Sequence, residues 1–173
     1  MRIRFLIAEA LLALALIGGA IGAGVAASFT NSQIRAQLAP QHIVFPADAA
    51  HGLPANLHAY AGQQVVNGDQ AHAYAEDFIG LHLKESGKSQ PYSYWSARAH
   101  DPTLSKAEQT AATKEADTLF KGEALKSMLN QAWTFSVIAR IASVASIACA
   151  AGAVLMLIVL GFETAATVRA TRR

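Results

Sequence analysis

Residues 141–162 read IASVASIACAAGAVLMLIVLGF, a continuous apolar stretch without one charged side chain. A helix rises about 1.5 Å per residue and the hydrocarbon core of a bilayer is about 30 Å thick, so about 20 residues cross it. Backbone polar groups find no water inside lipid, and a spanning segment must therefore satisfy them within a helix. The stretch predicts a transmembrane helix, which we expect to occupy residues 133–162 together with the residues that lead into it.

A second apolar stretch lies near the start of the chain. Residues 5–29 read FLIAEALLALALIGGAIGAGVAASF, with Glu9 as the single charge. Its length also matches a membrane-spanning helix. The basic residues before it and the small residues at 25–27 are typical of a cleavable signal peptide, which is the alternative interpretation. The membrane helix is favoured, because the apolar run exceeds the roughly 7–15 residues of a signal peptide.

The composition excludes several other classes of protein. Of the 173 residues, 53% are hydrophobic and 15% are charged, whereas a soluble domain carries roughly 25% charged residues. The net charge of +2 and the lack of a basic stripe argue against binding to nucleic acid. No nucleophile elbow, Walker motif or dinucleotide fingerprint occurs, so the sequence predicts no catalytic residue and no cofactor.

Arginines near the two apolar stretches predict the orientation in the membrane. They lie before the first stretch and after the second, at Arg2, Arg4, Arg169, Arg172 and Arg173. Because basic residues beside a span stay in the cytoplasm, we expect a plasma-membrane protein with both termini cytoplasmic and a basic tail at residues 163–173. Residues 30–132 then form an exoplasmic domain. They carry 8 Lys and Arg against 10 Asp and Glu, together with all six histidines.

The segment between the two stretches predicts a small, mainly helical domain. Pro40 should end the first long helix, and residues 42–45 are expected to be extended. Asp69 is a candidate N-cap for an amphipathic helix of about 16 residues. A capping box at 105–108 opens a helix that continues into the second span, with an expected kink near Gly122. The predicted fold class is an all-α membrane protein, in which two transmembrane helices form an antiparallel hairpin, with this domain between them in the chain.

Small residues in both spans are candidates for helix packing. Gly18 and Gly22 form a GxxxG pair, while Ser146 and Ala150 follow the same four-residue spacing in the second span. Helices associate in lipid through close van der Waals packing, which small side chains permit. Two interpretations remain open: the spans pack on each other within one chain, or they pack on other membrane protein subunits.

Glu9 is a further candidate contact residue. A carboxylate in hydrocarbon costs roughly 2.5–3.5 kcal/mol at the bilayer centre and less near the interface. Glu9 either reaches the headgroups beside the N-terminal arginines, or it meets a partner such as a basic side chain on another subunit.

Two alternative functions rest on side chains of the middle segment. His72 and Glu76 are four residues apart on one predicted helix, which suggests a metal-dependent exoplasmic enzyme or a metal sensor. A zinc site needs three or four converging ligands, and the histidine spacing predicts none. An aromatic group at Tyr92, Tyr94 and Trp95 suggests instead a ligand-binding ectodomain.

Three short stretches carry a resemblance to a known group of proteins. They are QAHAYAEDFIGLHL at 70–83, LFKGEALK at 119–126 and LNQAW at 129–133. With the second span after them, they resemble small two-pass membrane proteins from actinobacteria. The resemblance implies the two-pass architecture over most of the chain. Some of those proteins bear the label of aromatic ring-opening dioxygenase, whose iron needs two His and one carboxylate, and this sequence shows no such set.

The sequence therefore predicts a non-enzymatic membrane protein. Its expected partners are the lipid bilayer and other membrane protein subunits. The expected role is that of an interaction or accessory subunit in a larger membrane complex, for instance a respiratory or transport complex.

Overall fold

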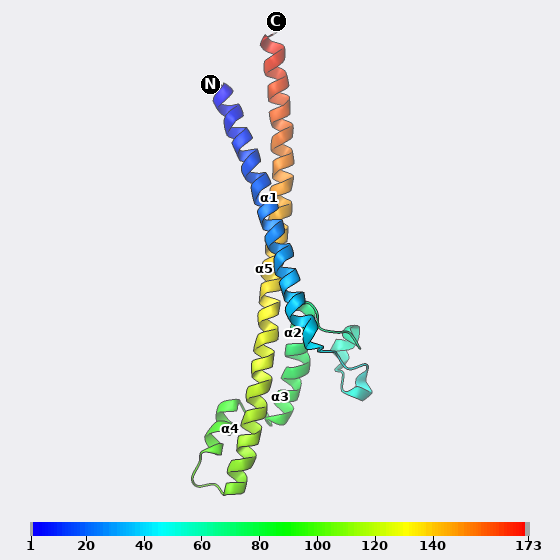
Figure 1. Ribbon diagram of the computed structural model, residues 1–173, viewed down its shortest axis with the longest axis vertical. Coiled ribbons are helices and arrows are strands. Elements are labelled where there is room, and N and C mark those ends of the chain that lie inside the picture. The colour runs from blue at the N-terminus through cyan, green and yellow to red at the C-terminus, as the bar shows by residue number, and fades with distance from the viewer. Residues whose placement is uncertain (1, 172–173) are drawn as a thin grey trace. The chain divides into compact units, whose positions relative to one another are not determined.

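The computed structural model describes residues 2–171, and the side chains of residues 4–169. Two long helices dominate this part of the chain, α1 (Arg2–Leu38) and α5 (Lys106–Thr171). Between them lie short helical elements: η1 (Ala39–Gln41), η2 (Ala49–His51), η3 (Ala55–Tyr60), α2 (Gly68–Ala73), η4 (Tyr74–Ile79), α3 (Gly80–Ser86) and α4 (Tyr92–Ala99) (Figure 1). The fold is all-α, as predicted. Arg172 and Arg173 of the expected basic tail lie outside the described residues.

The chain divides into two compact units, which we call the hairpin unit and the cap. The hairpin unit comprises Met1–Ser32 and Val137–Arg173, and the cap comprises Gln33–Ser136. Within the hairpin unit, α1 and α5 run antiparallel, because contacts at higher numbers in α1 meet lower numbers in α5. Leu16 packs at Gly152, and Gly24 packs at Ser146.

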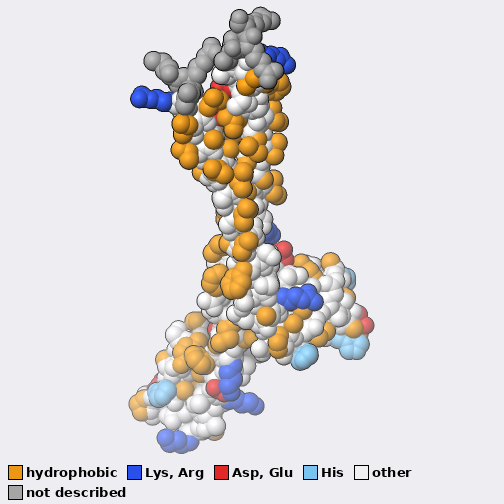
Figure 2. Space-filling view, turned by 45° about the horizontal axis from the view of Figure 1, so that its top comes forward, with side chains coloured by type: hydrophobic (Ala, Val, Ile, Leu, Met, Phe, Trp, Pro, Cys, Tyr) orange, Lys and Arg blue, Asp and Glu red, His pale blue; other side chains and the backbone are white. Residues whose placement is uncertain are grey.

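The two long helices present apolar side chains outward. Both are long and apolar enough to cross a membrane, and in the most apolar 18-residue window of each only 6% of the residues are buried. A core helix of a soluble protein would be mostly buried. On the face shown in Figure 2, orange hydrophobic side chains cover much of the hairpin unit, whereas the histidines appear on the cap. The exposed side chains include Leu11, Leu14, Ile21, Val25, Ile147, Val154, Leu155 and Ile158.

The cap has a core of its own around Phe45. This ring is only 1% exposed and lies 5.1 Å from the ring centroids of both Tyr60 and Tyr74. Leu129 of α5 belongs to the same buried cluster, so the cap folds against the first part of that helix. The other members of the cluster are Ile34, Leu38, Leu53, Leu57, Val65, Ala71, Ala75 and Ile79.

The first long helix ends and the extended segment begins almost as the sequence predicts. Helix α1 stops at Leu38, and Pro40 lies in η1. The prediction that residues 42–45 are extended is wrong for His42, which adopts a left-handed turn with a φ of 52°; Val44 forms one isolated antiparallel bridge with Gln64, rather than a strand within a sheet. The neighbouring amide of Phe45 donates a hydrogen bond to Gln63 O at 2.9 Å, which helps to hold this residue in the core.

The predicted N-cap of the amphipathic helix is wrong. Asn67, rather than Asp69, caps α2, because its side chain accepts a hydrogen bond from the backbone amide of Gln70 at 2.9 Å. The Gln70 side chain returns a bond by accepting from the amide of Val66 at 2.9 Å. This reciprocal pair resembles a capping box, and it places Asp69 in the first turn.

The capping box of α5 is confirmed. Glu108 accepts hydrogen bonds from the amide and the hydroxyl of Ser105, and Ser105 Oγ accepts from the Glu108 amide. Helix α5 then continues without interruption through Gly122. A Cβ atom at Gly122 would overlap the Leu83 side chain, so glycine allows α3 to approach the α5 backbone.

Replacing Phe45 by alanine should destabilise the cap strongly. Removing a fully buried aromatic ring typically costs about 3–5 kcal/mol, because it leaves a cavity. Val44→Ala is the matched control, since Val44 is 48% exposed and surface changes cost about 0.5 kcal/mol. Urea unfolding in detergent, followed by the fluorescence of Trp95 and Trp133, measures both. Equal losses of stability in the two variants would contradict the assignment of Phe45 to the core.

Candidate functional site

The contact between α1 and α5 in the hairpin unit is made by small residues at seven-residue intervals. Ala13 and Ala27 are buried on α1, with exposed fractions of 2% and 3%, and Ala139 and Ala153 are buried on α5. Midway between each pair, the Ser146 hydroxyl donates a hydrogen bond to Ala20 O at 2.6 Å. A seven-residue repeat keeps two supercoiled helices facing each other over many turns. Small side chains at these positions let the backbones approach closely.

Of the residues predicted from the four-residue spacing, some lie in this contact and others lie outside it. Ser146 lies in the contact, where its Oγ atom is 3.0 Å from the Cβ position of Gly24. Gly18 and Gly22 have open space at their Cβ positions, and Ala150 is exposed. The GxxxG pair therefore lies outside the intrachain contact, and its role in binding a partner stays a prediction.

Glu9 lies within α1 in an apolar surrounding. Its side chain is half-buried, and its Oε2 atom is buried with no hydrogen-bond partner among the described residues. A buried polar atom without a partner costs free energy. The pairing of Glu9 with a headgroup or with a partner subunit stays a prediction.

The intrachain contact predicts that substitution of Gly24 loosens the hairpin, whereas substitution of Gly22 does not. Gly24→Leu should loosen the hairpin, since overpacking against Ser146 costs about 1–3 kcal/mol. Gly22→Leu should leave it intact, because the space beside Gly22 is open. Cys149 reports the result, because its sulfur packs at Gly19 and it is the only cysteine. Faster maleimide labelling of Cys149 in detergent for Gly24→Leu alone is the expected outcome, and equal rates would refute it.

A polar cluster connects the central helix of the cap to α5. Glu76 Oε2 forms an ion pair with Lys126 Nζ at 2.9 Å, and Glu76 Oε1 accepts a hydrogen bond from Asn130 Nδ2 at 2.5 Å. The other end of the Asn130 amide, Oδ1, lies 3.0 Å from His72 Nδ1. Since an amide oxygen only accepts, this bond requires the proton on His72 Nδ1. The His72 ring stacks on Trp133 at 4.2 Å.

The cluster forms where the central helix changes its winding. Glu76 lies in η4, a π-helical turn between α2 and α3. Such turns are rare and frequently occur at functional sites. His72 and Glu76, which the sequence suggests as a pair of metal ligands, are bridged here by Asn130. Among the described residues, no group of three or more His, Cys, Asp or Glu is arranged to hold a metal ion.

The ion pair changes the acidity of Glu76. The hydrogen bond from Lys126 lowers the pKa of this carboxyl below its ordinary value of 4.5, and Asn130 and the charges of Lys126 and His72 act in the same direction. Burial raises the pKa of Glu76, but by less than these contacts lower it. The charged form of Glu76 is therefore stabilised in the folded cap.

The lowered pKa predicts how the stability of the cap depends on pH. Because folding favours the charged carboxyl, its contribution is full above pH 4.5 and is lost as the pH falls through the lower folded pKa. The contribution should be about 1 kcal/mol, since the Glu76 side chain is 38% exposed and exposed pairs are screened by water.

Glu76→Gln should flatten this acid dependence, and Asp77→Asn, a change at the exposed neighbouring acid, should not. Urea midpoints measured from neutral pH down to about pH 3.5 test both variants, because acid unfolding reports carboxylates stabilised in the native state. An unchanged acid dependence in Glu76→Gln would contradict the assignment.

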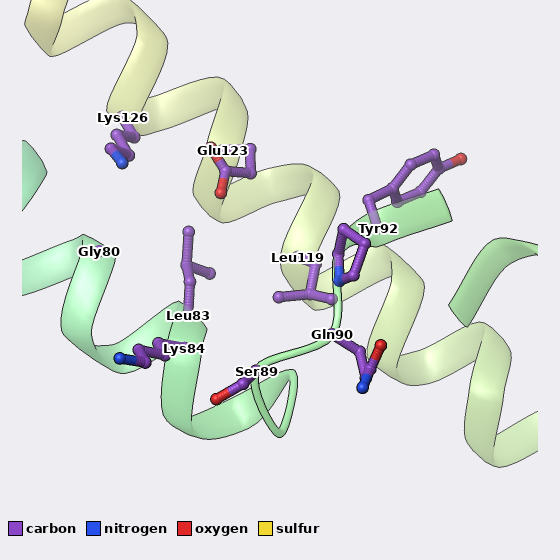
Figure 3. A pocket seen from close by; sticks show the side chains of 10 residues that line it. Gly80, Leu83, Lys84, Ser89, Gln90, Tyr92, Leu119, Glu123 and Lys126 are labelled. Carbon is purple, nitrogen blue, oxygen red and sulfur yellow. The ribbon is translucent and has the colours of Figure 1, made fainter. Parts of the chain in front are cut away.

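An open pocket of about 370 Å³ lies beside this cluster, between α3 and α5. Figure 3 shows Leu83 and Leu119 pointing into the space between these helices, whereas Gln90 and Tyr92 point away from it. Lys84, Lys126 and Glu123 line it, and the charge of Lys126 is already paired with Glu76. The lining therefore favours neither a cationic nor an anionic ligand, and we assign no substrate to it.

The aromatic side chains of α4 do not form one platform. Trp95 Nε1 donates a hydrogen bond to Gly87 O at 3.0 Å, and its ring meets Tyr94 at an interplanar angle of 88°. Tyr92 packs instead against Phe120 of α5, with ring centroids 5.9 Å apart. Trp95 and Tyr92 thus attach α4 to different neighbours, whereas Tyr94 contacts Trp95 and Arg98 of α4 itself, which gives the ligand-binding alternative little support.

Comparisons with protein families, with curated proteins and with solved structures find no match to this chain. The resemblance of residues 70–83 and 119–133 to two-pass actinobacterial proteins accordingly stays a prediction.

Proposed function

We propose that this chain is a two-pass integral membrane protein that acts as a non-enzymatic interaction or accessory subunit of a larger membrane complex. Helices α1 and α5 would cross the plasma membrane, with both termini in the cytoplasm and the cap on the exoplasmic side. The observation that carries the proposal is that two faces of α1 differ in their surroundings. Its Ala13–Ala27 face packs on α5, while Gly18 and Gly22 remain open.

The outward surface of the hairpin unit supports its insertion into lipid. Water would oppose the exposure of so many contiguous aliphatic side chains, since large exposed apolar patches in soluble proteins mark interaction sites. The antiparallel packing also favours an anchor over a cleaved signal peptide. The buried Ala13 and Ala27 both lie within residues 5–29, and cleavage after Ala27 would remove them and expose their contact surface on α5.

The open glycine pair supports a role in binding another membrane protein. Helices in lipid gain little from burying apolar surface, because the lipid tails are equally apolar. A helix face of glycines instead offers close backbone contact to a neighbouring helix. Gly18 and Gly22 lie one turn apart and are exposed, so a second helix can approach α1 there without displacing α5.

Gentle solubilisation tests this proposal. The tagged protein, extracted in mild detergent, should elute from size exclusion as a complex whose other members are identified by mass spectrometry. A double variant, Gly18→Leu with Gly22→Leu, should lose the partner while keeping the hairpin. Gly161→Leu is the matched control, because Gly161 of α5 is also open but stands outside the GxxxG pair. A monodisperse single chain without a co-purifying protein would overturn the proposal.

A further inference from the structure

Glu9 lies on the face of α1 that packs against α5. At 100° per residue, its position is about 20° around the helix from Ala20 and about 40° from Ala13. Ala20 O accepts the hydrogen bond from Ser146 of α5, and Ala13 is 2% exposed, so both residues mark the contact face. Glu9 is therefore directed toward α5 rather than toward the surrounding lipid.

Helix α5 offers Glu9 no polar partner at this level. Ala13 and Ala153 are both buried in the contact, and the two helices run antiparallel, so the residues that follow Ala153 lie level with those that precede Ala13. Residues 150–162 read AAGAVLMLIVLGF, in which no side chain donates a hydrogen bond. The Oε2 atom of Glu9 is accordingly buried without a hydrogen-bond partner among the described residues.

Arg4, the nearest described base, does not satisfy Glu9 either. It lies about 140° around α1 from Glu9 and about 7.5 Å nearer the N-terminus. Its side chain is exposed, and the ion pairs of the described residues do not include it. A carboxylate that reached the headgroups would expose both oxygens, whereas Oε2 of Glu9 is buried. The geometry thus disfavours the headgroup interpretation of Glu9.

The contact face of α5 is uncovered beyond Ala153. Ala153 is 4% exposed, whereas Leu157 is 49% exposed, although Leu157 lies only about 40° around the helix from Ala153. Within the hairpin unit, Figure 1 shows α1 and α5 separating toward the N and C ends of the chain. Since Glu9 is only half-buried, a third helix can reach it from the side of Leu157 while Ala13 stays in contact with α5.

We propose that Glu9 pairs with a lysine or arginine of a partner membrane helix that packs beside Leu157; the inference rests on the accessory function proposed above. Ionisable side chains within membrane spans are costly, and they almost always face a bundle interior or pair with one another. A charge taken out of water is compensated only by an opposite charge together with hydrogen bonds. One basic side chain on a neighbouring helix supplies both.

A second copy of this chain supplies no base at the level of Glu9. Among the described side chains of the hairpin unit, the bases are Arg4, Arg140 and Arg169. Measured along the helices from the buried Ala13–Ala153 level, Glu9 lies about 6 Å toward the chain ends. In the same direction Arg4 lies at about 14 Å and Arg169 at about 24 Å, while Arg140 lies about 20 Å the other way. Copies with the same orientation in the membrane keep these levels, so the partner is another membrane protein.

The Glu9 contact is separate from the glycine pair of the proposed function. Gly18 and Gly22 lie about 180° and 140° around α1 from Glu9. A single helix cannot lie against both faces of α1, so substitutions at the two places should act independently.

Quantitative co-purification tests the proposal. The tagged full-length chain is extracted in mild detergent, and mass spectrometry quantifies the co-purifying proteins for the wild type, Glu9→Gln and Glu163→Gln. Glu9→Gln should lower the yield of a partner at least about tenfold, because removing one member of a desolvated charge pair leaves the other buried and unpaired. Glu163→Gln is the matched control and should retain the partner, because Glu163 is an exposed acid near the same end of the hairpin unit.

A charge exchange tests the pair directly. The partner should carry a lysine or arginine near the cytoplasmic end of one of its spans. Replacing that base by glutamate together with Glu9→Lys should restore the complex that each change disrupts alone. Maleimide labelling of Cys149 at the wild-type rate shows that the hairpin is intact in these variants.

The outcomes separate this inference from the proposed function. A partner retained by Glu9→Gln, an equal loss in Glu163→Gln, a partner without such a base, or no restoration by the charge exchange would overturn the Glu9 pairing while leaving the accessory role open. A wild-type chain that elutes alone would overturn the accessory role and the Glu9 pairing with it.

Discussion

The close approach of two helix backbones is the constraint on which the hairpin unit depends. The Ser146 hydroxyl donates a hydrogen bond to the backbone carbonyl of Ala20, which lies inside α1. A side chain of α5 reaches the backbone of α1 only where neither helix carries a large side chain. Alanines seven residues before and after each of these positions preserve the approach over four helical turns of contact. In lipid, where apolar burial contributes little, such dispersion contacts and one interhelical hydrogen bond are the forces that remain. The outer faces are thereby left to large aliphatic side chains.

The cap relies on a different balance. Its core combines aromatic rings around Phe45 with one leucine of α5, and hydrogen bonds of Asn130 with Glu76 and His72 join the central helix to α5. Gly68 illustrates how tight this arrangement is, since a Cβ atom there would overlap Ser136 of α5. With no disulfide available to a chain that has one cysteine, the cap is held by packing, by helix caps and by the Glu76–Lys126 connection.

The long helices follow directly from the sequence, because bilayer thickness and helical rise set a length that residues 5–29 and 141–162 match. The capping box at Ser105 is also predictable from the sequence, because it is a local pattern. Other features are not predictable in this way. The spacing of four suggested Gly18 and Gly22 for helix packing, whereas the intrachain contact follows a spacing of seven, which a single helix cannot reveal without its partner. The cluster around Glu76 joins residues more than fifty positions apart, and no local pattern encodes such a meeting.

The π-helical turn of η4 fixes the length of the segment between the N-cap Asn67 and Leu83. Each residue added to or removed from that stretch rotates all that follows by about 100°. Leu83 would then leave the notch that Gly122 provides, and Glu76 would turn away from Lys126. Insertions and deletions should consequently be excluded from residues 74–79 in any descendant of this sequence, while the turns before Asn67 can change in length without disturbing the register of α3 on α5.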